Sequence, residues 1–263
     1  MNASVFPAAR PRPPFWRKVQ DRLVAGCSLL AVAMAVGAML WVLGTIVMRG
    51  ATVLGWDFLT NPSKPYGLPG AGIANALLGT LLITLTAAGM AIPPALAAGI
   101  WLAEFGKQSR TAAALRFCAN VLMGMPSVIV GLFAYTVIVV PMGTFSGFAG
   151  SVALAILMFP VVMRTTEDML RMVPDTLRES GLALGLTRCR VTLQIICRSA
   201  RNGLITGVLL SVARVSGETA PLLFTALFAD AWPTRFASGP TANIPVLITE
   251  YATNSPFESM HRA

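Results

Sequence analysis

Residues 203–228 read GLITGVLLSVARVSGETAPLLFTALF, an apolar run with two ionisable residues inside it. The run exceeds the roughly 20 residues that a helix needs to cross a bilayer. Arg214 and Glu218 would lie at membrane depth, where charged groups are costly and normally face a wet cavity or a partner. The stretch therefore predicts a membrane-spanning helix that lines a pathway.

The composition extends this prediction to the whole chain. Hydrophobic residues make up 55% of the 263 residues and charged residues 12%, whereas soluble domains carry about 25% charged residues. The mean hydropathy is +0.70. Because the apolar runs are too long for barrel strands, the expected fold class is all-α, a polytopic membrane helical bundle. The net charge of +9 does not indicate nucleic-acid binding, because the basic residues are dispersed in short loops.

Five apolar runs predict five spans, at residues 23–47, 73–102, 117–140, 148–163 and 203–228. We expect Pro93 and Pro94 to interrupt the second run, and Pro126 lies inside the third. The predicted organisation is a basic tail (1–22), a first span with its following loop (23–72), a transmembrane core (73–255) that includes a charged loop (164–202), and a short C-terminal tail (256–263). The apolar stretch near residues 244–248 is far too short to cross.

The distribution of basic residues predicts the orientation. Most of the 20 Lys and Arg residues fall in the tail, in the link between the second and third runs, and in the loop at 164–202. Since cytoplasmic loops carry an excess of Lys and Arg, these segments are predicted to be cytoplasmic, with the N-terminus inside.

The chain offers little material for a cofactor or a catalytic centre. The four cysteines form no CxxC pair and His261 is the one histidine, so neither a metal site nor a disulfide framework is expected. No GxxxxGK[ST] motif is present, so ATP must be used by a separate ATPase. We therefore expect no bound cofactor and no enzyme.

Residues 174–185, PDTLRESGLALG, predict a short helix in the charged loop. Proline suits a first helical turn, and Gly185 can supply the left-handed residue that ends a helix. Thr187 can then cap a second helix that runs to Arg201. Such a helix–glycine–helix unit is a suitable lever, and an ordinary surface connection is the alternative.

Four segments resemble those of a known family. Glu179-Ser180-Gly181 with Gly185 is similar to the cytoplasmic EAA motif of ABC importer permeases. Residues 102–105 (LAEF) and 125–132 (MPSVIVGL) resemble two further segments of that family, and residues 213–223 (ARVSGETAPLL) resemble the signature of its phosphate permeases. The chain thus resembles the PstA-like permeases of phosphate ABC importers over about residues 15–255.

The resemblance implies a fold, a location and partners. The fold is the type I, MetI-like permease bundle, which has six spans in the family, and the location is the bacterial inner membrane. The role is that of a permease subunit in an ATP-driven phosphate importer. The implied partners are a homologous second permease subunit, an ATPase subunit dimer, a periplasmic phosphate-binding protein and the lipid bilayer, with no nucleic acid. In the family the EAA loop docks into a cleft of the ATPase, which assigns the coupling loop here to Arg178, Glu179, Ser180, Gly181, Leu184 and Gly185.

Arg214 is the residue that we expect to bind the anion in the pathway. Its guanidinium stays charged and can bind phosphate through two hydrogen bonds. Glu218 could hold Arg214 in place or act as a repulsive gate; alternatively, the two merely neutralise each other as an i, i+4 pair. Thr219 and Ser127 are further pathway candidates, although the Ser127 hydroxyl could instead be satisfied within its helix.

Gly217, Pro221 and Pro126 are candidate structural or hinge residues. Gly217 and Pro221 flank Glu218, where they would weaken the helix and free backbone groups to meet an ion, as discontinuous helices do in transporters. The alternative is that they only permit close helix packing. Glu104 is expected to be an interfacial charge, with contact to the ATPase as the alternative.

Three features depart from the family pattern. Cys197-Arg198 stands where Leu-Pro is usual, and Asn202 replaces a proline. The chain also ends at residue 263, where a sixth span is expected to begin. These departures leave open a truncated or non-transporting regulatory or scaffold homologue. A permease for another oxyanion is a further alternative.

Overall fold

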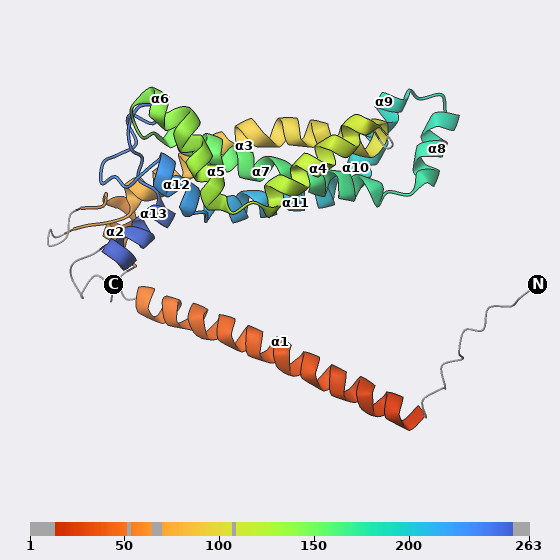
Figure 1. The fold of residues 1–263 in the computed structure, drawn as a ribbon, viewed down its shortest axis with the longest axis horizontal. Coiled ribbons are helices and arrows are strands. Elements are labelled where there is room, and N and C mark those ends of the chain that lie inside the picture. The colour runs from red at the N-terminus through yellow and green to blue at the C-terminus, as the bar shows by residue number, and fades with distance from the viewer. Residues whose placement is uncertain (1–13, 52–53, 65–69, 107–108, 255–263) are drawn as a thin grey trace, which may run out of the picture. The chain divides into compact units, whose positions relative to one another are not determined.

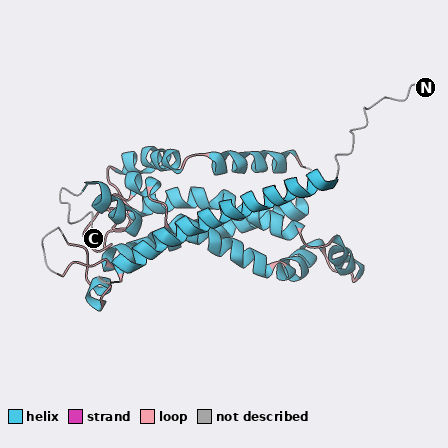
Figure 2. Cartoon of the chain, turned by 90° about the horizontal axis from the view of Figure 1, so that it is seen from below, coloured by secondary structure: helices cyan, strands magenta, loops and turns pink. Residues whose placement is uncertain are grey.

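The computed structural model describes residues 14–51, 54–64, 70–106 and 109–254. These residues are helical or lie in loops, with no strand among them (Figure 2). They form two compact units that divide after Leu54, and each unit is described by itself. The first unit contains α1 (Pro14–Gly50), whose part Lys18–Gly50 is long enough to cross a membrane and includes an 18-residue window with a mean hydropathy of 2.3.

The second unit holds all other helices of the described chain. In order they are α2 (Trp56–Thr60), α3 (Ala74–Ile100), the π-helix η1 (Trp101–Phe105), α4 (Arg110–Gly124), α5 (Ser127–Ala134), the π-helix η2 (Tyr135–Val139), α6 (Val140–Met142), α7 (Gly147–Arg171), α8 (Asp175–Ala183), α9 (Arg188–Arg190), the π-helix η3 (Val191–Ile196), α10 (Cys197–Ser199), α11 (Arg201–Ser216), α12 (Ala220–Thr225), α13 (Ile244–Thr249) and the π-helix η4 (Glu250–Asn254). Within this unit α8 and α9 lie at one end, and α2, α6, α12 and α13 lie at the other (Figure 1).

The α3–α7 pair forms the centre of the second unit. Gly99 of α3 lies so close to α7 that a Cβ atom there would be 2.6 Å from the Met163 carbonyl oxygen. Ile83, Leu154 and Met158 are among the buried residues of the core that the two helices share with α11 and α12. This close packing makes the pair a rigid unit, because closely packed protein interiors have low compressibility.

The helix α3 runs through Pro93 and Pro94 without a break, so the predicted interruption is wrong. Both prolines are exposed, and the alanines on either side of them, Ala91 and Ala95, are buried in the core. Packing of the opposite face therefore holds the helix together where the missing backbone donors would weaken it.

The apolar run at 117–140 forms two helices instead of one straight span. The helical segments Arg110–Gly124 and Ser127–Met142 meet at an angle of 102°. Met125 is extended, with φ −77° and ψ 137°, because the ring of the following proline disfavours the helical conformation there. Pro126 then starts a new helix as its N-cap residue.

The run at 203–228 is broken as well. Its main helix, α11, ends at Ser216, and α12 begins at Ala220. A second bend of 71°, at Ala200, separates α11 from the preceding segment Arg188–Ser199, so the helix predicted to run from Thr187 to Arg201 ends at Ser199. Three described helices can cross a membrane, or up to five if each bent pair counts as one span. The all-α fold class is thereby confirmed.

Candidate functional site

The helix break at 217–219 separates the two charged residues of the signature. Arg214 lies exposed in the last turn of α11, where a positive charge interacts favourably with the helix dipole. Glu218 is half-buried beyond the helix end, and its backbone N–H donates to the Val215 carbonyl at 3.1 Å. Among the described residues no ion pair joins Arg214 to Glu218, because the two no longer share one helix.

Gly217 and Pro221 mark the two sides of this break, as their residue types predict. Gly217 ends α11 with φ −94°, a value open to any residue, and a Cβ there would meet only the Arg214 carbonyl oxygen, at 3.8 Å. Pro221 lies in the first turn of α12, where its missing N–H costs nothing. Gly217 is therefore not required by space, and a role of either residue in meeting an ion stays a prediction.

A cavity of about 370 Å³ adjoins the break. Thr219, a predicted pathway residue, lines it together with Thr80, Ala213, Ser216, Gly217, Ile244, Pro245, Ile248 and Thr249. The hydroxyls of Thr80 and Ser216 already donate to backbone carbonyls, at 2.8 Å each. The cavity thus joins α3, α11 and α13 through a partly polar lining.

The structure brings the MPSVIVGL and GETAPLL segments together. A Cβ at Gly131 of α5 would lie 2.6 Å from the Pro221 Cα of α12, so this contact requires glycine. Ser127 is the half-buried first residue of α5, next to the N-cap Pro126. A hydroxyl in that position has no preceding turn of its own helix to donate to, and a role of Ser127 in the pathway stays a prediction.

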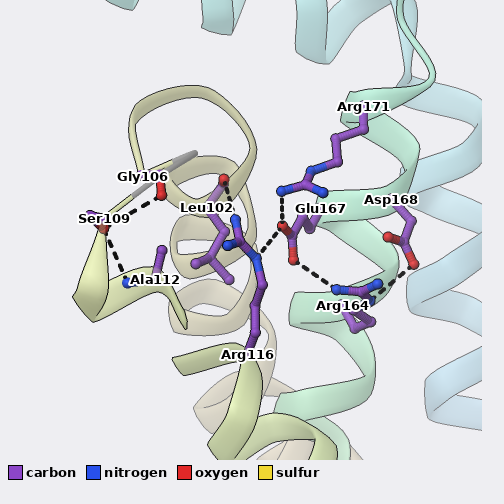
Figure 3. Close-up of polar contacts among 9 residues, drawn as sticks. All are labelled: Leu102, Gly106, Ser109, Ala112, Arg116, Arg164, Glu167, Asp168 and Arg171. Carbon is purple, nitrogen blue, oxygen red and sulfur yellow. Dashed lines mark hydrogen bonds and ion pairs between the residues drawn. The ribbon is translucent and has the colours of Figure 1, made fainter. Parts of the chain in front are cut away.

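A buried carboxylate that was not predicted from the sequence lies at the other end of the unit. Glu167 of α7 is fully buried and meets three arginines (Figure 3). Its distances are 2.7 Å to Arg116 Nε, 2.7 Å to Arg171 Nη2 and 3.3 Å to Arg164 Nη1. The spacing 164, 167 and 171 puts three of these groups on one helix face, which is the signal that could have revealed them.

Two further contacts complete this cluster (Figure 3). Arg116 Nη2 donates to the Leu102 carbonyl of η1 at 3.2 Å, so Arg116 connects α4, α7 and η1. Arg164 Nε lies 3.3 Å from Asp168 Oδ2. The three arginines outnumber the two carboxylates, which leaves the cluster with positive charge.

A second arginine bridge links the predicted coupling helix to η1. Arg178 of α8 approaches Glu104 with Nη2 at 2.7 Å from Oε1 and with Nε at 3.2 Å from Oε2. Hydrogen bonding to Glu104 raises the pKa of Arg178 above its usual value, against the opposing effect of burial. Glu104 is expected from the sequence to be an interfacial charge, and the structure adds that its carboxylate has a specific partner within the chain, Arg178.

Glycine is required at two positions of the EAA-like motif, Gly181 and Gly185, for different structural reasons. Gly185 adopts the left-handed conformation, with φ +78°, after the end of α8, as predicted. Gly181 is buried, and a Cβ there would lie 2.8 Å from Ile195 Cδ1 and 2.9 Å from Val191 Cγ2. The glycine thus lets α8 lie directly on η3, and Thr187 begins the second helix without a side-chain cap bond.

The remaining motif residues form the outward surface of α8. Glu179 and Ser180 are exposed, and Leu184 is 81% exposed. A leucine this exposed at a helix end is available to a partner surface.

Comparisons with known proteins identify the family. Residues 95–249 match the family described as "Binding-protein-dependent transport system inner membrane component". A "Phosphate transport system permease protein PstA" from Yersinia pestis is 40% identical over 256 residues, covering 97% of this chain and 86% of the relative. One of the same name from Haemophilus influenzae is 42% identical, covering 92% and 85%, and a "Probable phosphate transport system permease protein PstA" from Methanocaldococcus jannaschii is 36% identical, covering 88% and 82%.

The fold has a solved counterpart. A chain of the MetNI methionine ABC transporter, in inward-facing conformations, superposes with a TM-score of 0.58 at 19% identity, covering 72% of this chain and 83% of that chain. This likeness shows the permease fold that the sequence predicts. The chain therefore belongs to the binding-protein-dependent transport system inner membrane component family and, within it, to the PstA permeases, so that it is a multi-pass membrane subunit for transport and not an enzyme.

Proposed function

We propose that this chain is the permease subunit of an ATP-driven inorganic phosphate importer and forms half of its translocation pathway. The observation that carries the proposal is the 40% identity, over 97% of the chain, to a protein named as a phosphate transport permease. The other half comes from a homologous second permease subunit. A periplasmic binding protein delivers phosphate, and an ATPase dimer supplies the energy.

The proposed orientation follows from charge. Basic residues gather at the α8 end of the second unit (Figure 1), where Arg171 ends α7, Arg188 and Arg190 lie in α9, and Arg198 lies in α10. Positive charge marks the cytoplasmic side of inner-membrane proteins. The α8 end is therefore cytoplasmic, and α8 docks on the ATPase through its exposed residues Glu179, Ser180 and Leu184. By the same rule the basic tail at residues 1–22 places the N-terminus in the cytoplasm.

Arg214 binds the phosphate on its way through the pathway. Two observations support this role: Arg214 is exposed at a helix break, and it has no ion-pair partner among the described residues. A guanidinium that already pairs with a carboxylate has fewer N–H donors left for an anion. Glu218, on the other side of the break, repels the anion and keeps binding weak enough for release. Thr219, the N-cap residue of α12, and Ser127, the first residue of α5, contribute hydroxyls.

Labelled-phosphate uptake by this chain, co-expressed with its ATPase, second permease and binding protein, tests the proposal. Arg214→Gln is expected to lower uptake at least about a hundredfold, because two charge-assisted hydrogen bonds are lost. Arg201→Gln, at the opposite end of the same helix, is the matched control and should leave uptake within about twofold.

Each result has a defined meaning. Undiminished uptake by the Arg214→Gln complex contradicts the pathway role. An assembled complex of the unaltered chain that takes up no phosphate contradicts the proposed function and favours a scaffold role, whereas preferential uptake of sulfate assigns another oxyanion.

A further inference from the structure

Arg178 ties the proposed coupling helix to the ends of two long helices. From α8 it donates to Glu104 in η1, as described, and its Nη2 also donates to the Leu170 carbonyl of α7 at 2.7 Å. Its Nη1 donates to the Val173 carbonyl and lies 3.0 Å from Asp175 Oδ1. One guanidinium thus contacts η1, α7 and the link between α7 and α8.

The contact between the two charges is shielded from water. The side chains of Arg178 and Glu104 are 12% and 9% exposed. A bidentate guanidinium–carboxylate contact is directional, and shielding strengthens it. Apolar packing, such as the cluster of Leu170, Val191 and Ile196 beside it, resists separation but has no preferred direction.

The receiving element is fixed on its other side as well. The Leu102 carbonyl of η1 accepts from Arg116, and Arg116 also pairs with the buried Glu167 of α7. Since η1 continues α3 directly, a pull on Glu104 acts on the whole of α3. About 36 Å along that helix, Thr80 lines the cavity beside the signature break.

One face of α8 is therefore exposed, and the other contacts the rest of the second unit. Leu184, Glu179 and Ser180 point to the exterior, whereas Arg178 is committed inward. We propose that the Glu104–Arg178 pair is the positioning link that transmits movement of α8 to α3, and through α3 to the cavity at the signature break. This inference rests on the proposed function, in which the ATPase moves α8.

The alternative is that the pair only stabilises the fold, and the two roles predict different results. A merely stabilising pair lowers the amount of assembled complex and leaves each assembled complex fully coupled. A transmitting pair leaves assembly intact and lowers the phosphate moved per ATP hydrolysed. The ratio of transport to hydrolysis is therefore the decisive quantity.

The experiment uses the complete complex, reconstituted in liposomes with phosphate-loaded binding protein. Glu104→Gln keeps the size of the side chain and removes its charge, and should retain the ATPase while lowering phosphate uptake per ATP about tenfold. Arg178→Lys keeps the charge but loses the fork that reaches Glu104 and the Leu170 carbonyl together, and should give an intermediate loss. Asp21→Asn on α1 is the acid-to-amide control and should match the unaltered chain.

Three results overturn the inference. The first is an unchanged ratio of phosphate transported to ATP hydrolysed in the Glu104→Gln complex. The second is a loss of assembled complex that accounts for all of the lost uptake. The third is an Arg178→Lys complex that is fully coupled while Glu104→Gln fails to assemble. If the unaltered complex assembles but moves no phosphate, the proposed function itself fails and the inference falls with it. Transport by the unaltered complex with an unchanged ratio in both variants removes only the inference.

Discussion

Glu167 is the residue at which local electrostatics matter most. Removing a buried charge from water is costly, and the cost is offset here by contacts to three arginines. Its sequence position gave little warning, because the predicted span ended at residue 163 and Glu167 fell in the charged loop. The structure extends α7 to Arg171 and so turns a supposed loop carboxylate into a core group.

Replacing this carboxylate should expose its importance for stability. Glu167→Gln leaves three arginines without their shared partner, and we expect a loss of about 2–3 kcal/mol, moderated because those arginines are partly exposed. Asp168→Asn, at a half-exposed site one residue on, should cost less than about 1 kcal/mol. Thermal unfolding of the purified subunit in detergent measures both, and equal melting temperatures would contradict the assignment.

At the scale of elements, the helices follow local chemistry wherever neighbours do not override it. Met125–Pro126 bends the chain as proline requires, and Gly185 ends α8 as its left-handed conformation allows. Pro93 and Pro94 do not break α3, because tertiary packing supplies what the backbone loses. The Glu104–Arg178 pair could not be predicted either, since its partners are 74 residues apart and no periodicity connects them.

The α3–α7 contact allows a sharp comparison between two glycines of one helix. Gly99→Ala should force the helices apart and destabilise the subunit by about 1–3 kcal/mol, because the new Cβ meets the Met163 backbone and Thr166. Gly89→Ala meets nothing within 4 Å and should be neutral or stabilise by up to about 1 kcal/mol through helix propensity. Only Gly99→Ala should therefore lower the melting temperature, and an equal drop in Gly89→Ala would contradict the role of the close α3–α7 contact.

At the scale of the whole molecule, composition together with the length of the apolar runs was sufficient to predict an all-α membrane bundle. The number and course of the spans were less predictable, because two of the five apolar runs fold as bent or broken helices. The residue types Gly217 and Pro221 indicated a weakened helix in the segment 213–223. They did not predict that Arg214 and Glu218 are separated, because that depends on the end of α11 at Ser216. The EAA-like residues predicted the short helix α8 and its glycine end, whereas the surfaces that hold this helix come from distant parts of the chain.

The proposed orientation can be checked by labelling one end of the second unit at a time. Cys189 is exposed on α9, so a variant that keeps only this cysteine should react with a membrane-impermeant maleimide in inside-out vesicles and not in intact spheroplasts. The matched variant carries Thr234→Cys as its single cysteine, at an exposed site, and should show the reverse pattern. Labelling of Cys189 in spheroplasts would place α8 on the outside and contradict the orientation.

The exposed Leu184 has a consequence for how the cell must make this subunit. An apolar side chain that stays exposed to water, as Leu184 does without a partner, is a binding site for chaperones and a target for proteases. Copies synthesised in excess of their ATPase should therefore be short-lived, and the amount of the transporter should follow whichever component is scarcest.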